Sequence, residues 1–78
     1  MADPIAELRN VVAASPPAPP EMAGYLEKVR DRAYAIVDGD VEALKAAGFS
    51  EDEIFEQTVA VAIAEGLRRL DRAAEAIE

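Results

Sequence analysis

One carboxylic acid, Glu65, directly follows an apolar run and is the residue best placed for acid–base chemistry. Burial would raise its pKa, because desolvation disfavours the charged form, unless an arginine lies close. Arg68 and Arg69 follow at the spacing that brings side chains together on one helix face. Perturbed acids are structural more often than catalytic, so we expect an ion pair here. Tyr34 is expected to be a core aromatic rather than a proton donor, and it completes our candidate set of buried polar residues.

Acidic residues also alternate at Asp38, Asp40 and Glu42, as they do at the start of a calcium loop. Such a loop needs Gly at its sixth position and Glu at its twelfth, and these positions hold Ala43 and Phe49. The chain has no Cys and no His, which removes the soft zinc ligands and the usual activating bases. We therefore predict no metal, no cofactor and no catalytic residue, and the composition argues against a self-sufficient enzyme.

The size and net charge of the chain limit the kinds of molecule that it is expected to bind. The 78 residues suffice for one domain with a small core, and without disulfides or a metal the remaining source of stability is self-association. The formal charge of -8 repels phosphate, so we predict neither nucleic-acid nor membrane binding. The chain has no membrane-spanning run, and its start lacks the features of a signal peptide. We therefore expect a cytoplasmic protein.

The first half of the chain is predicted to form two helices. Asp3 and Pro4 are a helix start, because Asp caps free amides and Pro has no N–H to leave unpaired. This N-terminal helix, residues 1–15, should end before a proline-rich linker at residues 16–20. It could pack on its own subunit or swap onto a neighbour. A second helix is expected to begin at residue 20 or 21 and to run to about residue 37, opening the main helical domain, residues 21–78.

Cap signals delimit two further helices. Asp40 is placed to cap a short helix over residues 41–47, which Gly48 would close in a left-handed conformation. Ser50 and Glu53 have the spacing of a capping box, which predicts a last helix over residues 51–77, about 40 Å long. We therefore predict an all-α fold of three to four helices, a short helical hairpin plus one long C-terminal helix, assembled into an oligomeric helical bundle.

The last predicted helix has more apolar residues than are required to pack one of its faces against a core. One face has apolar or small residues spaced 4-3-4-4-3-4, namely Phe55, Val59, Ala62, Gly66, Leu70, Ala73 and Ile77. Residues 59–64 are apolar all the way round, which is typical of a helix covered on every side. We expect that so short a chain cannot cover this segment by itself, and that a second subunit covers it. The candidate interface residues are Phe55, Val59, Val61, Ala62, Ile63, Leu67 and Leu70.

A longer motif overlaps these cap signals. Residues 40–54 read DVEALKAAGFSEDEI, and a helix of small apolar residues then leads to the pair Arg69-Leu70. With these features residues 25–77, roughly two thirds of the chain, resemble the carboxymuconolactone decarboxylase and alkyl hydroperoxidase D superfamily. The resemblance implies an all-helical subunit that assembles through long helices. Active members use a C-x-x-C pair, a nearby His and an upstream Glu, and this chain has no Cys or His. Only the later half of the family's unit is matched, so no catalytic residue carries over.

Three hypotheses follow. The favoured one is a non-catalytic, self-associating helical protein, a homo-oligomer that resembles a truncated member of this superfamily. The alternative is a partner subunit of a separately encoded peroxidase- or decarboxylase-like enzyme of the same superfamily. A weaker alternative is small-molecule binding or catalysis in an inter-subunit pocket around Glu65.

Overall fold

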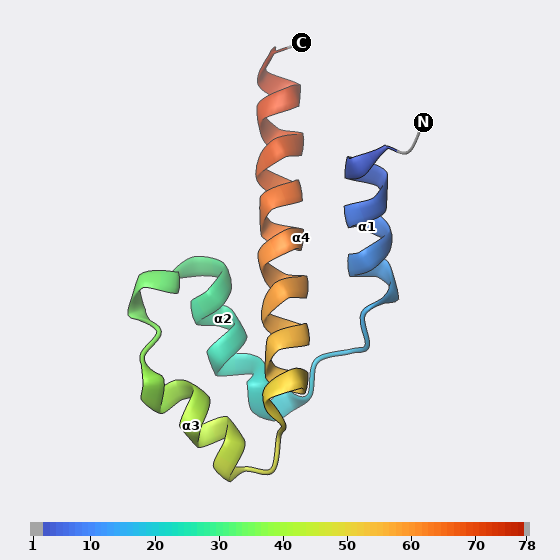
Figure 1. Ribbon diagram of the computed structural model, residues 1–78. Coiled ribbons are helices and arrows are strands. Elements are labelled where there is room, and N and C mark those ends of the chain that lie inside the picture. The colour runs from blue at the N-terminus through green and yellow to red at the C-terminus, as the bar shows by residue number, and fades with distance from the viewer. Residues whose placement is uncertain (1–2, 78) are drawn as a thin grey trace.

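The computed structural model describes residues 3–77 and confirms the all-helical fold with one long C-terminal helix. These residues contain no strand and form four α-helices, which are α1 (Pro4–Ala14), α2 (Ala23–Asp31), α3 (Asp38–Ala46) and α4 (Glu51–Ile77). Two short 3-10 turns, η1 (Pro20–Met22) and η2 (Ala33–Ala35), flank α2. The long helix α4 is the axis of the molecule, with α1 along one side and α2 and α3 on the other (Figure 1). Within residues 3–77, no helix is both long and apolar enough to cross a bilayer.

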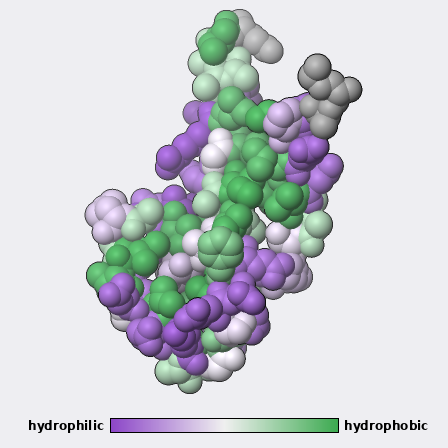
Figure 2. All heavy atoms as spheres, viewed as in Figure 1, coloured by the Kyte–Doolittle hydropathy of each residue, from purple (hydrophilic) through white to green (hydrophobic). Residues whose placement is uncertain are grey.

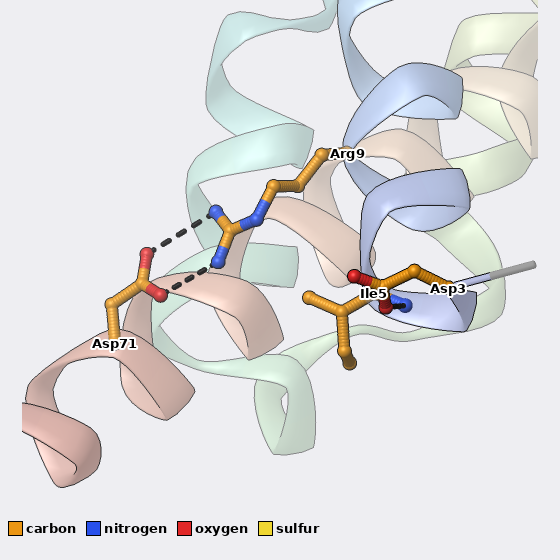
Figure 3. A network of polar contacts seen from close by, with 4 residues as sticks. All are labelled: Asp3, Ile5, Arg9 and Asp71. Atoms are coloured by element: carbon orange, nitrogen blue, oxygen red, sulfur yellow. Dashed lines mark hydrogen bonds and ion pairs between the residues drawn. The ribbon is translucent and has the colours of Figure 1, made fainter.

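The N-terminal helix packs on α4 of its own chain. Its start is as predicted, since the Asp3 carboxylate accepts a hydrogen bond from the Ile5 N–H at 2.9 Å and Pro4 occupies the first turn. The Arg9 guanidinium donates to both carboxylate oxygens of Asp71, at 2.7 and 3.3 Å, and so ties α1 to the C-terminal half of α4 (Figure 3). Yet α1 has no buried residue, so this contact is a surface one.

The second helix is shorter than predicted. It was expected to reach residue 37, but α2 ends at Asp31 and the Arg32 backbone leaves the helical region with φ -148° and ψ 54°. The chain then turns back through η2, and this return brings Leu44 of α3 against Met22 and Leu26. The break also leaves Tyr34 87% exposed, so the prediction that Tyr34 is a core aromatic was wrong.

The third helix begins earlier than predicted, and Asp40 caps it from inside. The helix α3 starts at Asp38, which makes Asp40 the third helical residue rather than the N-cap. One Asp40 oxygen accepts from the Val37 N–H at 2.9 Å, and the other accepts from Lys28 Nζ at 2.9 Å. Asp40 therefore joins α2 to α3 as well as satisfying a free amide at the start of α3.

The predicted cap signals before α4 are confirmed. Gly48 adopts φ 104°, the left-handed conformation that favours glycine. The Glu53 N–H donates to Ser50 Oγ and the Ser50 N–H donates to the Glu53 carboxylate, both at 3.1 Å. This reciprocal capping box fixes the start of the long helix.

The core lies at the N-terminal half of α4. Its buried side chains are Met22, Leu26, Leu44 and Ile54, which η1, α2, α3 and α4 each contribute, and Val61 packs against them. Further along α4, Ala60 and Leu67 are the other buried apolar residues. Beyond Leu67 every described residue of α4 is exposed. The last part of the long helix therefore extends past the core that anchors it.

Candidate functional site

Glu65 forms the ion pair that its spacing predicted. Its carboxylate lies 2.7 Å from an Arg68 guanidinium nitrogen and 3.3 Å from Arg69 Nε, and its side chain is only 13% exposed. The hydrogen bond from Arg68 lowers the pKa of Glu65, and this outweighs desolvation, which acts in the opposite direction. Glu65 is therefore a charged carboxylate at neutral pH, and a charged carboxylate is not a proton donor.

The rest of the predicted buried polar set lies at the surface. The side chains of Arg68 and Arg69 are 65% and 75% exposed, and Tyr34 is exposed on η2. Tyr34, Glu65 and Arg69 do line one shallow groove between α2 and α4, of about 380 Å³. Of these three side chains only Glu65 is shielded from solvent, and because its ion pair lowers its pKa, the groove does not hold the raised carboxyl pKa that is typical of a catalytic acid.

The apolar band at residues 59–64 is mostly covered by its own chain. Ala60 is buried, Val61 packs against the core, and Val59, Ile63 and Ala64 are half-buried. The expectation that the chain could not shelter this band was wrong, because α1 folds back along α4 and covers a side that a hairpin alone would leave open. Within the band only Ala62 is exposed.

The candidate interface residues differ in exposure, and they include buried, half-buried and exposed side chains. Leu67 is 8% exposed and Val61 contacts the core, so these two face their own chain rather than a free surface. Ile63 is half-buried. Phe55 and Leu70 are 70% and 45% exposed, and they face solvent together with Ala62. These residues differ in exposure because they point in different directions around α4, where each successive side chain is rotated by 100°.

The exposed group belongs to a longer apolar surface, which we call the α4 stripe. It comprises Phe55, Val59, Ala62, Gly66, Leu70, Ala73 and Ile77. At 100° per residue all of these lie within about 40° of one direction. Ile77 is 86% exposed at one end and Phe55 is 70% exposed at the other. Figure 2 shows the apolar surface as a band that follows α4 between α1 and α2. At 1.5 Å per residue the stripe is about 33 Å long.

The stripe has a regular period. Phe55, Gly66 and Ile77 are separated by eleven residues each, and the members between them repeat at the same offsets. Eleven residues correspond to about 3.67 residues per turn, close to the 3.6 of a straight helix. The stripe therefore drifts by only about 20° per repeat and stays on one face of α4, and the sense of the drift favours a slight right-handed coil of paired helices.

The charges beside the stripe are unevenly distributed along α4. Three acids, Glu51, Asp52 and Glu53, occupy its first turn, where they suit the positive end of the helix dipole. Three arginines, at positions 68, 69 and 72, lie in its C-terminal half and border one surface hollow with Glu65. The C-terminal half also holds Asp71 and Glu75, so it is neutral overall, whereas the first turn is acidic.

Sequence reasoning missed one buried polar residue, Gln57. It is 7% exposed, and its side-chain nitrogen donates to the Pro16 carbonyl at 3.0 Å. This bond fastens the proline-rich linker to α4 and thereby directs α1 back along the helix. A signal was present, since Gln57 stands between Ile54 and Val61 at helical spacing on the buried face.

Comparisons with family models, with curated proteins and with solved structures found no match to this chain. The resemblance to the carboxymuconolactone decarboxylase and alkyl hydroperoxidase D superfamily therefore rests on the motif at residues 40–54. Several residues of that motif cap helices here, since Asp40 caps α3 from within, Gly48 follows its end, and Ser50 and Glu53 cap α4. Among residues 3–77, no group of three acids is placed to hold a metal ion together.

Proposed function

We propose that this protein is a non-catalytic, self-associating helical protein, and that the α4 stripe packs against the stripe of a second copy. The observation that carries the proposal is the exposure of the stripe, whose seven residues are exposed apart from the half-buried Val59. The largest apolar patch on a soluble monomer commonly covers about 300–600 Å² and is often an interaction site. A derived member of the superfamily named above, which assembles through long helices, would use α4 in this way.

The glycine in the middle of the stripe supports close packing of a second helix. Glycine in a helix interior is about 1 kcal/mol less favourable than alanine. A Cβ added at Gly66 would meet nothing within 4 Å, so no contact within the chain calls for glycine at this position. Small residues at a helix surface allow two helix backbones to approach closely, and Ala62 and Ala73 lie on the same face. A partner helix accounts for a glycine that the chain's own packing does not require.

The stripe by itself is smaller than a standard protein–protein interface. A helix face about 33 Å long and 10 Å wide offers about 330 Å², below the roughly 800 Å² per partner of a standard interface. Val11 of α1 is 49% exposed and borders a groove with Phe55 and Val59, which widens the apolar surface toward α1. We therefore propose a dimer that forms through α4 with α1 at its edge and that dissociates on dilution.

The test is sedimentation equilibrium over about a hundredfold range of protein concentration, because mass action makes a reversible dimer concentration-dependent. The informative variant is Gly66→Gln, which adds a long polar side chain where a partner helix would pack. The matched control is Gly24→Gln, since Gly24 also lies in a helix with nothing within 4 Å of an added Cβ.

We expect the original chain and Gly24→Gln to dimerise alike and Gly66→Gln to dissociate at concentrations at least tenfold higher, a change of about 1.4 kcal/mol. Both substitutions should stabilise the monomer slightly, because Gln is a better helix former than Gly. A chain that remains a folded monomer across the whole range would refute the proposal. Equal association by the two variants would show that the stripe is not the contact.

A further inference from the structure

We infer that the two copies pair with their α4 helices antiparallel, on a two-fold axis that passes close to Gly66. This rests on the proposed function, since it concerns the geometry of that dimer. Two features carry it, the order of side-chain sizes along the stripe and the distribution of charge along α4, and the eleven-residue period lets the contact run along the whole helix.

Side-chain size favours the antiparallel arrangement. Reversing α4 about Gly66 places Ala62 opposite Leu70 of the second copy, and Val59 opposite its Ala73. At these two levels a larger side chain meets a smaller one, as in interdigitating helix pairs. At the two ends of the stripe large side chains meet, because Phe55 lies opposite Ile77 of the second copy. In a parallel pair every residue meets its own copy, so two leucines would face each other at position 70 and two alanines at position 62. The two leucines would hold the helices apart at position 70, and the two alanines would leave a gap at position 62.

Charge favours the same orientation. A parallel pair would set the two acidic first turns side by side, each with Glu51, Asp52 and Glu53. These like charges would repel in a chain that already carries a net charge of -8. The antiparallel pair separates the acidic turns by about the length of α4 and places each one beside the C-terminal end of the other copy's helix. That C-terminal half carries no net charge, because Glu65, Asp71 and Glu75 balance its three arginines. The helix dipoles also oppose each other in this orientation.

The eleven-residue period makes the pairing possible along the whole helix. A seven-residue period would require the helices to coil around each other to stay in contact. Phe55, Gly66 and Ile77 lie within about 40° of one another around the helix, so two helices with a slight right-handed coil can remain in contact from end to end. In the antiparallel pair this contact brings the stripe ends together, so Phe55 of one copy lies near Ile77 of the other.

The chain has no cysteine, so single cysteines can report the orientation without background. Val59→Cys and Ala73→Cys are each treated with a short bifunctional maleimide, alone and as an equimolar mixture that has been allowed to exchange subunits. In the antiparallel pair, like positions lie about 21 Å apart along the axis, whereas position 59 faces position 73. Gly66→Cys serves as the control for reagent access, because it faces its own copy in both orientations.

We expect each of the two variants alone to give little covalent dimer, and the mixture to give covalent dimer in up to roughly half of the chains, the statistical share of mixed pairs. Strong crosslinking of Val59→Cys with itself would overturn the inference and show a parallel pair. A dimer in sedimentation that crosslinks at position 66 but in neither pattern at 59 and 73 would also overturn it and leave the proposed function standing. If sedimentation shows only monomer, the proposed function fails first.

Discussion

Replacing Met22 with alanine is the sharpest test of the core. Met22 is 0% exposed and forms one buried cluster with Leu26, Leu44 and Ile54, which come from α2, α3 and α4. Removing a fully buried side chain of this size loses about 1.5–3 kcal/mol of transfer free energy, and the cavity left behind adds to that loss. We expect Met22→Ala to lower the free energy of unfolding by about 3 kcal/mol.

That loss is large for so small a protein. At 0.05–0.15 kcal/mol per residue, a chain of 78 residues has about 4–12 kcal/mol of stability. A loss of about 3 kcal/mol should lower the melting temperature by about 12–24 °C. The variant should therefore keep its helices at low temperature and unfold well below the original chain.

The assay is urea unfolding followed by circular dichroism at one fixed protein concentration, because self-association would otherwise add its own stabilisation. The control is Val37→Ala, since Val37 is 61% exposed and its truncation should change the free energy of unfolding by no more than about 0.5 kcal/mol. If Met22→Ala and Val37→Ala unfold at the same urea concentration, Met22 is not the centre of the core and the packing described above is incorrect.

Three further outcomes follow from the capping, charge and exposure of the helices. Ser50→Ala removes the hydroxyl that accepts from the Glu53 N–H and should lower the free energy of unfolding by about 1 kcal/mol in urea titrations, whereas Ser50→Asp, which keeps an acceptor, should restore most of it. The pKa of Asp40 is lowered from 3.8, chiefly by the Val37 N–H and then by Lys28, so its stabilisation is present above pH 3.8 and is lost as the pH falls toward the lowered value. The drop in urea midpoint between pH 5 and pH 3 should therefore be smaller in Asp40→Asn, and an equal drop would contradict the assignment. Backbone amides of α1 should exchange with solvent faster than those around Ile54, because α1 buries no residue, and equal protection in hydrogen-exchange mass spectrometry would show that α1 is held more firmly than its contacts indicate.

The helix boundaries that could be predicted from sequence are those set by local chemistry. The Asp3 cap, the left-handed Gly48 and the Ser50–Glu53 box each act within a few residues, so their side chains alone identify them. The end of α2 could not be predicted in this way. Residues 32–37 contain no proline, and all of them are apolar or compatible with a helix, so no local signal ends α2 there. The helix breaks at Arg32 because α3 has to return to the core.

The same division applies to the candidate site. The pair between Glu65 and Arg68 was predictable because helical spacing alone brings the two together. The burial of Leu67 and the exposure of Phe55 were not, since both are large apolar residues on one helix and only the position of α1 decides which is covered. That position depends on Gln57 holding the linker at Pro16, a contact between residues distant in sequence. Sequence periodicity identified the apolar surface, but the long-range contacts determine which part of it remains free.

The length of α4 and the small size of the core both favour the antiparallel pair that we propose. All four residues of the core cluster lie in or beside the N-terminal half of α4. Beyond Leu67 every described residue of the helix is exposed, and α1, which lies alongside it, buries no residue. An isolated helical end gains little from propensity alone, so packing must supply the stability of that half. In the antiparallel pair that we propose, the protruding half of each α4 would lie against the core-bearing half of the other copy. The exposed Leu70 and Ile77 would then be covered by the part of the molecule that is most firmly held, and each copy would support the end of the helix that its own chain leaves bare.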